Sequence, residues 1–245
     1  MKIKWFKTIS STQKHLINST STYKDTYPVI ATMHQTRGVG RTNSTWQSLI
    51  HTLSFSYVTH AHVAYIDVIG RVRHVLVDQG VDALCKWPND VLVRNGETYH
   101  KVCGALIDVI GEYAVVGVGV NLGYTCTCTI GCDKCTGISM DEWCTEDNKE
   151  ATCDGQYSGN IANYKTLRDV TGVEVTPLQF FEHYFTAADR FYTYDWRDRY
   201  VNYRGERMEI IDKRELRLKD RNGNIHLIDP MVCSYDYHSN SIVGK

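Results

Sequence analysis

The chain has 245 residues, and its 27 lysines and arginines against 28 aspartates and glutamates give a formal net charge of −1. This balance argues against a protein that binds nucleic acid by general electrostatic attraction, because such proteins carry a clearly basic face. Hydrophobic residues make up 42% of the chain, which predicts a folded protein. No stretch approaches the roughly 18 apolar residues of a membrane span and no signal peptide is visible, so we expect a cytoplasmic protein without membrane association.

Short elements are expected in the first part of the chain. Hydroxyl side chains at 8–12 precede a helix through His15 and Leu16, and residues 29–33 form a strand. Residues 34–46 contain Gly38 and Gly40, which predicts a loop able to adopt positive φ values. The alternation of apolar and polar residues predicts a strand at 52–58, and helical spacing of apolar residues predicts a helix over 60–79.

Strand periodicity follows, with segments at 83–86, 91–94, 99–110 and 113–122. The turn pairs Asn95-Gly96 and Gly111-Glu112 between them predict an antiparallel meander.

Another helix and a small β unit are expected towards the C-terminus. Thr176 before Pro177 marks the start of the helix, and its apolar stripe is predicted to comprise Leu178, Phe181, Phe185, Ala188 and Tyr192. From about residue 201, strands at 208–211, 216–218 and 225–228, with a hairpin turn at 222–223, predict a small β unit.

The chain contains nine cysteines. An odd number without a signal peptide argues against a secreted disulfide framework. Cys85, Cys103 and Cys233 lie in apolar runs and are expected to be small buried side chains.

The other six cysteines lie within 124–160, a polar segment without clear periodicity. Cys126, Cys128, Cys132 and Cys135 include one Cys-x₂-Cys pair and supply enough thiolates for a tetrahedral zinc site. The spacing has no second such pair and no histidine joins the set. A loop of reduced thiols is therefore the alternative.

The first segment suited to chemistry is Gly38-Val39-Gly40-Arg41. Its flexible backbone offers N–H groups, and Arg41 adds a fixed positive charge. This combination suits a phosphate or an acyl-adenylate. An ordinary surface loop is the alternative.

The second segment is Lys86-Trp87-Pro88-Asn89-Asp90, which places a cation and a carboxylate at the end of a strand. The lysine could bind phosphate oxygens of a nucleotide and the aspartate could face its Mg²⁺ or the water ligands of that ion. A simple turn has the same composition.

Glycines within two adjacent predicted strands form the third pattern: Lys101 precedes Gly104 on one strand, and Gly117 and Gly119 precede Asn121 on the next. Glycine inside a strand often marks a close approach by a ligand, which predicts a narrow slot with a charged end. A tightly packed sheet with a bulge is the alternative.

Taken in order, these segments resemble the catalytic region of biotin–protein ligases, the biotin–[acetyl-CoA carboxylase] ligase or holocarboxylase synthetase family. The pattern is Gln-Thr-x-Gly-x-Gly-Arg…Trp, Lys-Trp-Pro-Asn-Asp, Lys-x-x-Gly-x-Leu and Gly-x-Gly-x-Asn, preceded by Ser-Ser-Thr-Gln at 10–13. It covers roughly residues 5–123. Residues 160–245 resemble the closing helix and the small SH3-like C-terminal domain of that family, though less closely.

The resemblance implies an α+β fold with a mixed, mainly antiparallel sheet and flanking helices, the class II aminoacyl-tRNA-synthetase-like fold of biotin and lipoate ligases. It implies a catalytic domain at 1–195, with a Cys-rich insertion at about 124–160, and a small β domain at 196–245. The resemblance is to the short form without an N-terminal DNA-binding domain, so no DNA binding is expected.

The implied activity is ATP-dependent attachment of biotin to a lysine of a biotin-carrier domain of a biotin-dependent carboxylase, through biotinyl-5′-AMP and with Mg²⁺. The implied catalytic residues are Lys101, Arg41, Lys86 and Asp90. Biotin would contact Ser11, Thr12, Gln13, Gln35, Gly38, Val39, Gly40, Arg41, Lys101, Gly104, Gly117 and Gly119. ATP would contact Arg41, Trp46, Lys86 and Asn121, and no side chain is assigned as a metal ligand.

The chain also departs from the usual bacterial loop of that family, because Val39, Asn43 and Ser44 replace two arginines and a glycine. Arg41 is retained. A lipoate–protein ligase or octanoyltransferase of the same fold is the nearest alternative, although the run 86–90 favours biotin. A transferase using Cys103 as nucleophile and a zinc-dependent interaction module are the others.

Overall fold

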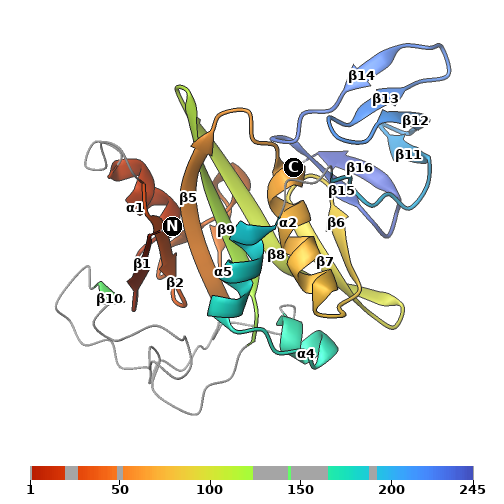
Figure 1. Cartoon of the computed structure of the whole chain (residues 1–245). Coiled ribbons are helices and arrows are strands. Elements are labelled where there is room, and N and C mark those ends of the chain that lie inside the picture. The colour runs from red at the N-terminus through yellow and green to blue at the C-terminus, as the bar shows by residue number, and fades with distance from the viewer. Residues whose placement is uncertain are drawn as a thin grey trace.

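The computed structural model describes residues 2–19, 27–48, 52–123, 143–144, 165–187 and 192–244. Its main sheet contains β1 (Ile3–Phe6), β2 (Val29–Thr32), β5 (Thr52–His60), β6 (Ala83–Lys86), β7 (Asp90–Asn95), β8 (Thr98–Ile110), β9 (Tyr113–Asn121) and β10 (Trp143–Cys144). The spatial order is β10-β1-β2-β5-β9-β8-β7-β6 (Figure 1). Strand β1 pairs in parallel with β2 and β10, and the remaining pairs are antiparallel. The expected mixed, mainly antiparallel α+β fold is confirmed.

The meander predicted from the strand periodicity is also confirmed. Strands β6, β7, β8 and β9 are consecutive antiparallel neighbours. Gly96 and Gly111, in the turns of the two longer hairpins, each have φ of 61°. This left-handed conformation favours glycine, so the turn residues fix where the chain reverses.

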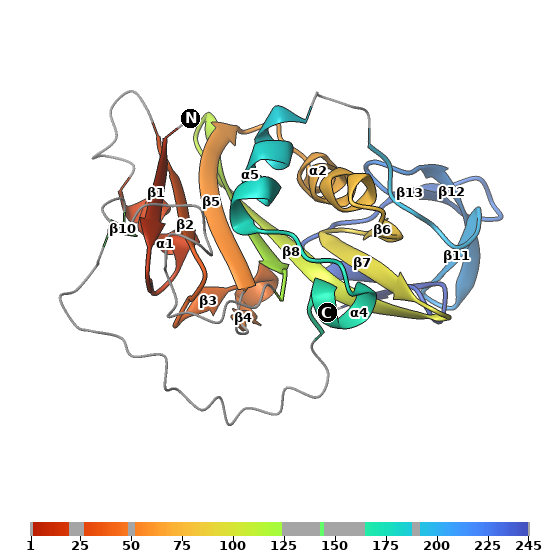
Figure 2. The same cartoon turned by 60° about the horizontal axis from the view of Figure 1, so that its bottom comes forward.

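Helices cover both faces of the sheet. α2 (Tyr65–Asp78) and α5 (Pro177–Thr186) lie side by side on one face, where they contact each other, as Figures 1 and 2 show. The short helix α1 (Thr12–Asn18) contacts β5 and β9 and contributes to a second, smaller cluster of buried apolar residues. Because strand side chains alternate between faces, Phe55 packs towards α5 whereas its neighbour Ser56 faces α1.

The start of one predicted helix needs correction, and the start of another is confirmed. Helix α2 begins at Tyr65 rather than near residue 60, because β5 continues to His60 and the Asp67 carboxylate accepts the backbone N–H of Ala64 at the helix start. The predicted start of α5 at Thr176 and Pro177 is confirmed.

The buried stripe of α5 is shifted relative to the prediction. Its buried aromatic side chains are Phe180, Phe181 and Tyr184, and the rings of Phe181 and Tyr184 lie 4.9 and 5.3 Å from Phe55. Leu178 is only half-buried. The helix ends at Thr186, so Tyr192 is not part of it, and Ala188 lies outside the described residues.

A second sheet follows in the C-terminal part of the chain. It contains β11 (Tyr200–Tyr203), β12 (Glu206–Asp212), β13 (Arg217–Lys219), β14 (Ile225–Leu227), β15 (Cys233–Asp236) and β16 (Ser241–Gly244), in the order β14-β13-β12-β11-β16-β15. The predicted antiparallel hairpins through β12, β13 and β14 are confirmed. The Arg214 guanidinium donates to both carboxylate oxygens of Asp67 at 2.9 and 2.7 Å, which ties this sheet to α2.

The remaining helix, α4 (Leu167–Thr171), precedes α5 and ends at Gly172, whose φ is 73°. Within the described part of the chain, no helix is both long and apolar enough to cross a membrane. Cys85, Cys103 and Cys233 are buried free thiols, as expected. The proposed zinc ligands Cys126, Cys128, Cys132 and Cys135 lie outside the described residues.

Candidate active site

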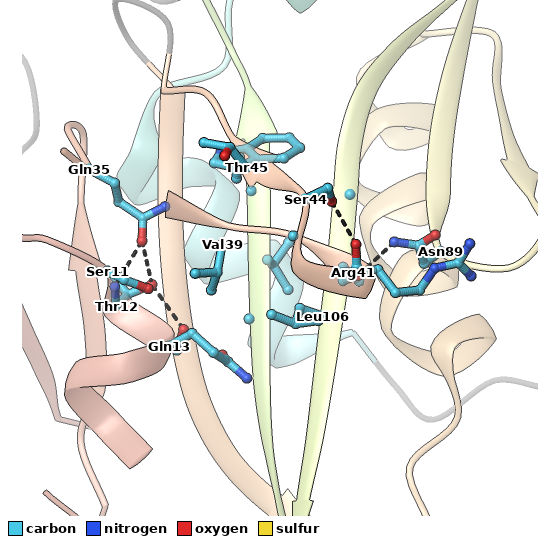
Figure 3. Close-up of a pocket in the computed structure, with 18 of the residues that line it drawn as sticks. Ser11, Thr12, Gln13, Gln35, Val39, Arg41, Ser44, Thr45, Asn89 and Leu106 are labelled. Carbon is cyan, nitrogen blue, oxygen red and sulfur yellow. Dashed lines mark hydrogen bonds between the residues drawn. The ribbon is translucent and has the colours of Figure 1, made fainter. Parts of the chain in front are cut away.

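A cavity lies on the face of the main sheet opposite α5. Its lining comes from α1, the loop at 34–46, and strands β5, β8 and β9, with Asn89, Asp90 and Ser234 at one side. Figure 3 shows Thr12, Gln13 and Gln35 at one end and Arg41 and Asn89 at the other, with Val39 and Leu106 between them. The cavity therefore has two polar ends separated by an apolar stretch.

The loop over the cavity folds into a small antiparallel pair, β3 (Gly38–Val39) and β4 (Thr45–Trp46), joined by a 3₁₀ turn, η1 (Arg41–Asn43). The left-handed residue is Thr42, with φ of 57°, rather than either glycine as predicted. Gly38 and Gly40 are required because there is no room for a side chain at either position. A Cβ at Gly38 would lie 2.5 Å from the Trp46 carbonyl oxygen, and one at Gly40 would lie 2.6 Å from Ser44 Oγ.

Glycines form the floor of the cavity on adjacent strands. Gly119 pairs with Gly104 across β9 and β8, and Gly117 pairs with Ser56 of β5. An added Cβ would lie 2.4 Å from the Trp46 ring at Gly119 and 3.1 Å from the same ring at Gly104. At Gly117 it would lie 2.5 Å from Gln13 Oε1. Only glycine leaves room for these groups, and for a ligand, to approach the strands closely.

One end of the cavity is a network of buried hydroxyls and amides. Gln35 Oε1 accepts from the Thr12 backbone N–H at 2.8 Å. Thr12 Oγ1 and Ser56 Oγ are 2.9 Å apart, and Ser56 donates to Gln13 Oε1 at 3.0 Å. Ser11, which caps the N-terminus of α1, is also fully buried. Buried polar groups of this kind require hydrogen-bond partners, so this end suits a ligand group rich in donors and acceptors.

The other end carries positive charge around one carboxylate. Asp90 Oδ1 lies 2.7 Å from Lys101 Nζ, and Asp90 Oδ2 lies 3.5 Å from Lys86 Nζ. Burial alone would raise the pKa of Asp90, but the charges of Lys101, Lys86 and Arg41 outweigh it and lower that pKa below its usual range. Three cations with one carboxylate leave excess positive charge, which suits phosphate and carboxylate oxygens.

A β-bulge aims Lys101 into this end of the cavity. Val91 pairs with Cys103 and Leu92 pairs with Lys101, so Val102 is the extra residue of β8. Val102 and Cys103 are both fully buried in the core, whereas Lys101 and Gly104 flank them on the cavity side. The bulge interrupts the alternation of side chains and so brings Lys101 and Gly104 to one face. The structure therefore contains both features predicted for this segment: a cavity lined by strand glycines and a β-bulge.

Arg41 connects the loop to the C-terminal sheet. Its side chain is 3% exposed, and it donates to the carbonyl oxygens of Pro230 and Cys233, the latter at 3.0 Å. Burial lowers the pKa of Arg41, while nearby Tyr65 and Asp90 act in the opposite direction. The neighbouring Ser234 lines the cavity. The C-terminal sheet is therefore part of the wall of this site.

A protein-held magnesium ion does not fit this site. Among the described lining residues, Asp90 is the one carboxylate, and it is already paired with two ammonium groups. No cluster of three or more histidine, cysteine, aspartate or glutamate side chains occurs in the described parts of the chain. Magnesium binding in nucleotide enzymes usually uses one or two carboxylates together with substrate phosphates.

Replacing Asp90 with asparagine is expected to lower the free energy of unfolding by about 1.5–3 kcal/mol near pH 7, as for loss of a charge-assisted hydrogen bond. Since the folded-state pKa of Asp90 is lowered, its stabilisation is fully present above its unfolded pKa of about 3.9 and is lost as the pH falls towards the folded value. The stability difference between the parent and Asp90→Asn should therefore be constant above about pH 5 and shrink from there towards pH 3.

Urea unfolding at a series of pH values measures this difference. Asp82→Asn is the control, because the Asp82 carboxylate is exposed and lies 4.0 Å from its arginine partner. A difference for Asp90→Asn that stays constant down to pH 3 would contradict the assigned ion pair.

The cavity brings together most of the site residues expected from the sequence: Ser11, Thr12, Gln13, Gln35, Val39, Gly40, Arg41, Trp46, Asp90, Lys101, Gly104, Gly117 and Gly119. Gly38, Lys86 and Asn121 do not line it. Gly38 pairs with Trp46, Lys86 Nζ lies 3.5 Å from Asp90 Oδ2, and the Asn121 side chain accepts a hydrogen bond from Thr52.

The prediction missed the other lining residues, which are Ser44, Thr45, Ser56, Asn89, Ala105, Leu106, Val118 and Ser234. A signal for Ser56 existed, because Thr52, Ser54 and Ser56 alternate with the apolar residues of β5 and are all buried. No local signal marks Ser234, which reaches the site only through the packing of the second sheet.

Residues 5–123 match the model of the biotin/lipoate A/B protein ligase family. This segment of the chain is similar to that family, as its motifs indicated. The biotin–protein ligase of Schizosaccharomyces pombe is 27% identical over an alignment of 139 positions, and the match covers 45% of this chain. The chain spans about a fifth of the length of that relative, of which 21% is covered.

Two solved structures share the fold over the whole chain. The biotin protein ligase of Aquifex aeolicus in complex with biotin and ATP has a TM-score of 0.58 and 16% identity, covering 100% of this chain and 99% of that one. The biotin acetyl coenzyme A carboxylase synthetase of Helicobacter pylori, with bound biotinylated ATP, has a TM-score of 0.53 and 15% identity, covering 100% and 96%. At these identities the likeness establishes the ligase fold, including the second sheet.

Proposed function

We propose that this chain attaches biotin to a lysine of an acceptor protein in two steps. A biotin carboxylate oxygen first attacks the α-phosphorus of ATP, which forms biotinyl-5′-AMP and releases pyrophosphate. The neutral amine of the acceptor lysine then attacks the acyl carbon, AMP leaves and the nitrogen loses a proton. The names of the yeast relative and of the two bacterial structures support this assignment.

The observation that carries the proposal is the polarity of the cavity from end to end. Biotin has a polar ureido ring, an aliphatic chain and a carboxylate, in that order. The cavity offers buried hydroxyls and amides, then Val39 and Leu106, then the cationic end with Lys101 (Figure 3). Each part of biotin thus finds a matching surface.

The same comparison argues against lipoate and octanoate, which other members of this fold use. Neither acid has an N–H donor or carbonyl acceptor at the end distant from its carboxylate. Binding one of them would place an apolar end against Ser11, Thr12 and Gln35 and would offer no partner to their remaining donors and acceptors. Each unsatisfied buried polar group costs about 1–3 kcal/mol, which favours biotin.

The cationic end supplies the chemistry of the first step through charge and position. Lys101 would neutralise the biotin carboxylate and the α-phosphate as they approach each other, and Lys86 would add charge through the shared Asp90. Because these charges are fixed before substrates bind, little reorganisation is needed in the transition state. Magnesium would enter with ATP, bound to its phosphates, as part of the substrate.

Trp46 and Arg41 would hold the nucleotide part of the intermediate. The Trp46 ring lies over Gly104 and Gly119, and Lys101 Nζ is 5.8 Å from its centroid. Arg41 would keep the loop closed over the adenylate while its guanidinium holds the C-terminal sheet. The Asn121 side chain is held by its hydrogen bond with Thr52 and would lie next to the adenine group.

A thioester mechanism through Cys103 is disfavoured. The Cys103 thiol is fully buried on the core side of β8, and burial raises its pKa. A nucleophilic cysteine needs an exposed, stabilised thiolate. Acyl transfer directly from the adenylate to the acceptor lysine requires no such group.

The expected acceptor is the biotin-carrier domain of a biotin-dependent carboxylase, in the cytoplasm. Incubation of the protein with biotin, Mg-ATP and such a domain should add one biotinyl group to a single lysine, as measured by intact-mass and peptide mass spectrometry. A carrier domain with that lysine changed to arginine is the control. Labelling that persists on the control, or that needs no ATP, would contradict the proposal.

A further inference from the structure

Gln13 is held in one orientation at the polar end of the cavity. Its Nε2 donates to Asp108 Oδ2 at 2.8 Å and to the Val115 carbonyl oxygen at 2.9 Å. A carboxylate and a carbonyl only accept hydrogen bonds, so the amide nitrogen must face them. Gln13 Oε1 therefore points to the cavity floor, where an added Cβ on Gly117 would lie 2.5 Å from it.

This orientation sets the direction of the neighbouring hydroxyls. Ser56 donates its single hydrogen to Gln13 Oε1, over 3.0 Å. The Ser56 oxygen is then the acceptor in its 2.9 Å contact with Thr12 Oγ1. The one hydroxyl hydrogen of Thr12 has two acceptors within reach, Ser56 Oγ at 2.9 Å and Gln35 Oε1 at 3.2 Å. Both hydroxyl hydrogens are thus held by protein acceptors, which leaves oxygen lone pairs for a ligand.

We propose that Asp108 is a positioning residue that selects for ligand head groups carrying N–H donors, by fixing the Gln13 amide and, through it, the hydroxyl of Ser56. The proposal rests on the function proposed above, since the biotin ureido ring supplies two such donors. Asp108 is half-buried on β8 and does not line the cavity itself.

Without Asp108, only the Val115 carbonyl would hold the amide nitrogen, and the Gln13 side chain could turn its NH₂ group towards Ser56. The Ser56 hydroxyl would then reverse, and its hydrogen would meet an N–H group of the ligand. Loss of one charge-assisted hydrogen bond of about 1.5–3 kcal/mol corresponds to at least about a tenfold change in affinity.

The test compares Asp108→Ala with Asp108→Asn, whose amide oxygen can still accept from Gln13. Binding of two probes is measured by calorimetry without ATP: biotin, and 5-(thiolan-2-yl)pentanoic acid, which keeps the thiolane ring, chain and carboxylate of biotin but lacks the ureido ring. Asp108→Ala should weaken biotin binding by about tenfold and leave binding of the analogue unchanged. Asp108→Asn should restore most of the affinity for biotin.

Steady-state kinetics should show a higher KM for biotin in Asp108→Ala, with the KM for ATP and kcat within about twofold of the parent. Asp82→Ala, at an exposed carboxylate, is the control and should match the parent. Unchanged biotin binding in Asp108→Ala, or equal weakening of biotin and the analogue, would overturn the role of Asp108. A parent protein that binds neither biotin nor the analogue would overturn the proposed function itself.

Discussion

Lys101→Ala is expected to slow the formation of biotinyl-5′-AMP by at least about 100-fold, the effect of removing one preorganised charge from a developing transition state. Lys101 is held on β8 beside a bulge and by its 2.7 Å ion pair with Asp90, so its charge is in place before substrates bind. Rapid-quench measurement of pyrophosphate release in a single turnover would give the rate of this step directly.

Lys219→Ala provides the matched control, since Lys219 is an exposed lysine on β13 of the second sheet. It should form the adenylate at the parent rate. Thermal unfolding of both variants would show that each is folded. A normal rate of adenylate formation in Lys101→Ala would remove Lys101 from the reaction centre.

Gly119→Val is expected to weaken biotin binding by about 10- to 100-fold, matching the 1–3 kcal/mol cost of overpacking. The first added atom would already lie 2.4 Å from the Trp46 ring. Trp46 is half-buried on the loop above the sheet, so the ring can move away from the strand. We therefore expect the free energy of unfolding to change less than the biotin affinity.

Equilibrium biotin binding and urea unfolding, measured on the same samples, separate these two effects. Gly244→Val is the control, because an added Cβ at Gly244 meets no atom within 4 Å. Parent-like affinity in Gly119→Val would show that the ligand does not lie on the glycine floor. A loss of stability as large as the loss of affinity would point to a purely structural role for Gly119.

The local elements of the fold were predictable because each depends on nearby residues. The β6–β9 meander follows from strand periodicity with glycines in its turns, and the start of α5 follows from Thr176 and Pro177. The buried stripe of α5 was misassigned because the adjacent aromatic residues Phe180 and Phe181 both pack inward. Helical spacing alone does not decide which of several apolar residues faces Phe55.

The site was predictable only as far as its residues lie in recognisable motifs. Lys101 and the floor glycines belong to such motifs, although the bulge that aims Lys101 depends on pairing with β7. Ser234 and Asp108 reach the site through contacts distant in sequence, since Ser234 belongs to the second sheet and Asp108 acts through Gln13, 95 residues earlier. The periodicity of apolar residues does not predict such contacts between residues that are distant in sequence.

The most direct test of the proposed function is pyrophosphate release from Mg-ATP with biotin, lipoate and octanoate supplied separately at equal concentration. The buried hydroxyls and amides at one end of the cavity predict release with biotin and little above background with the other two acids. Release with lipoate or octanoate, and none with biotin, would contradict the assignment of this chain as a biotin–protein ligase.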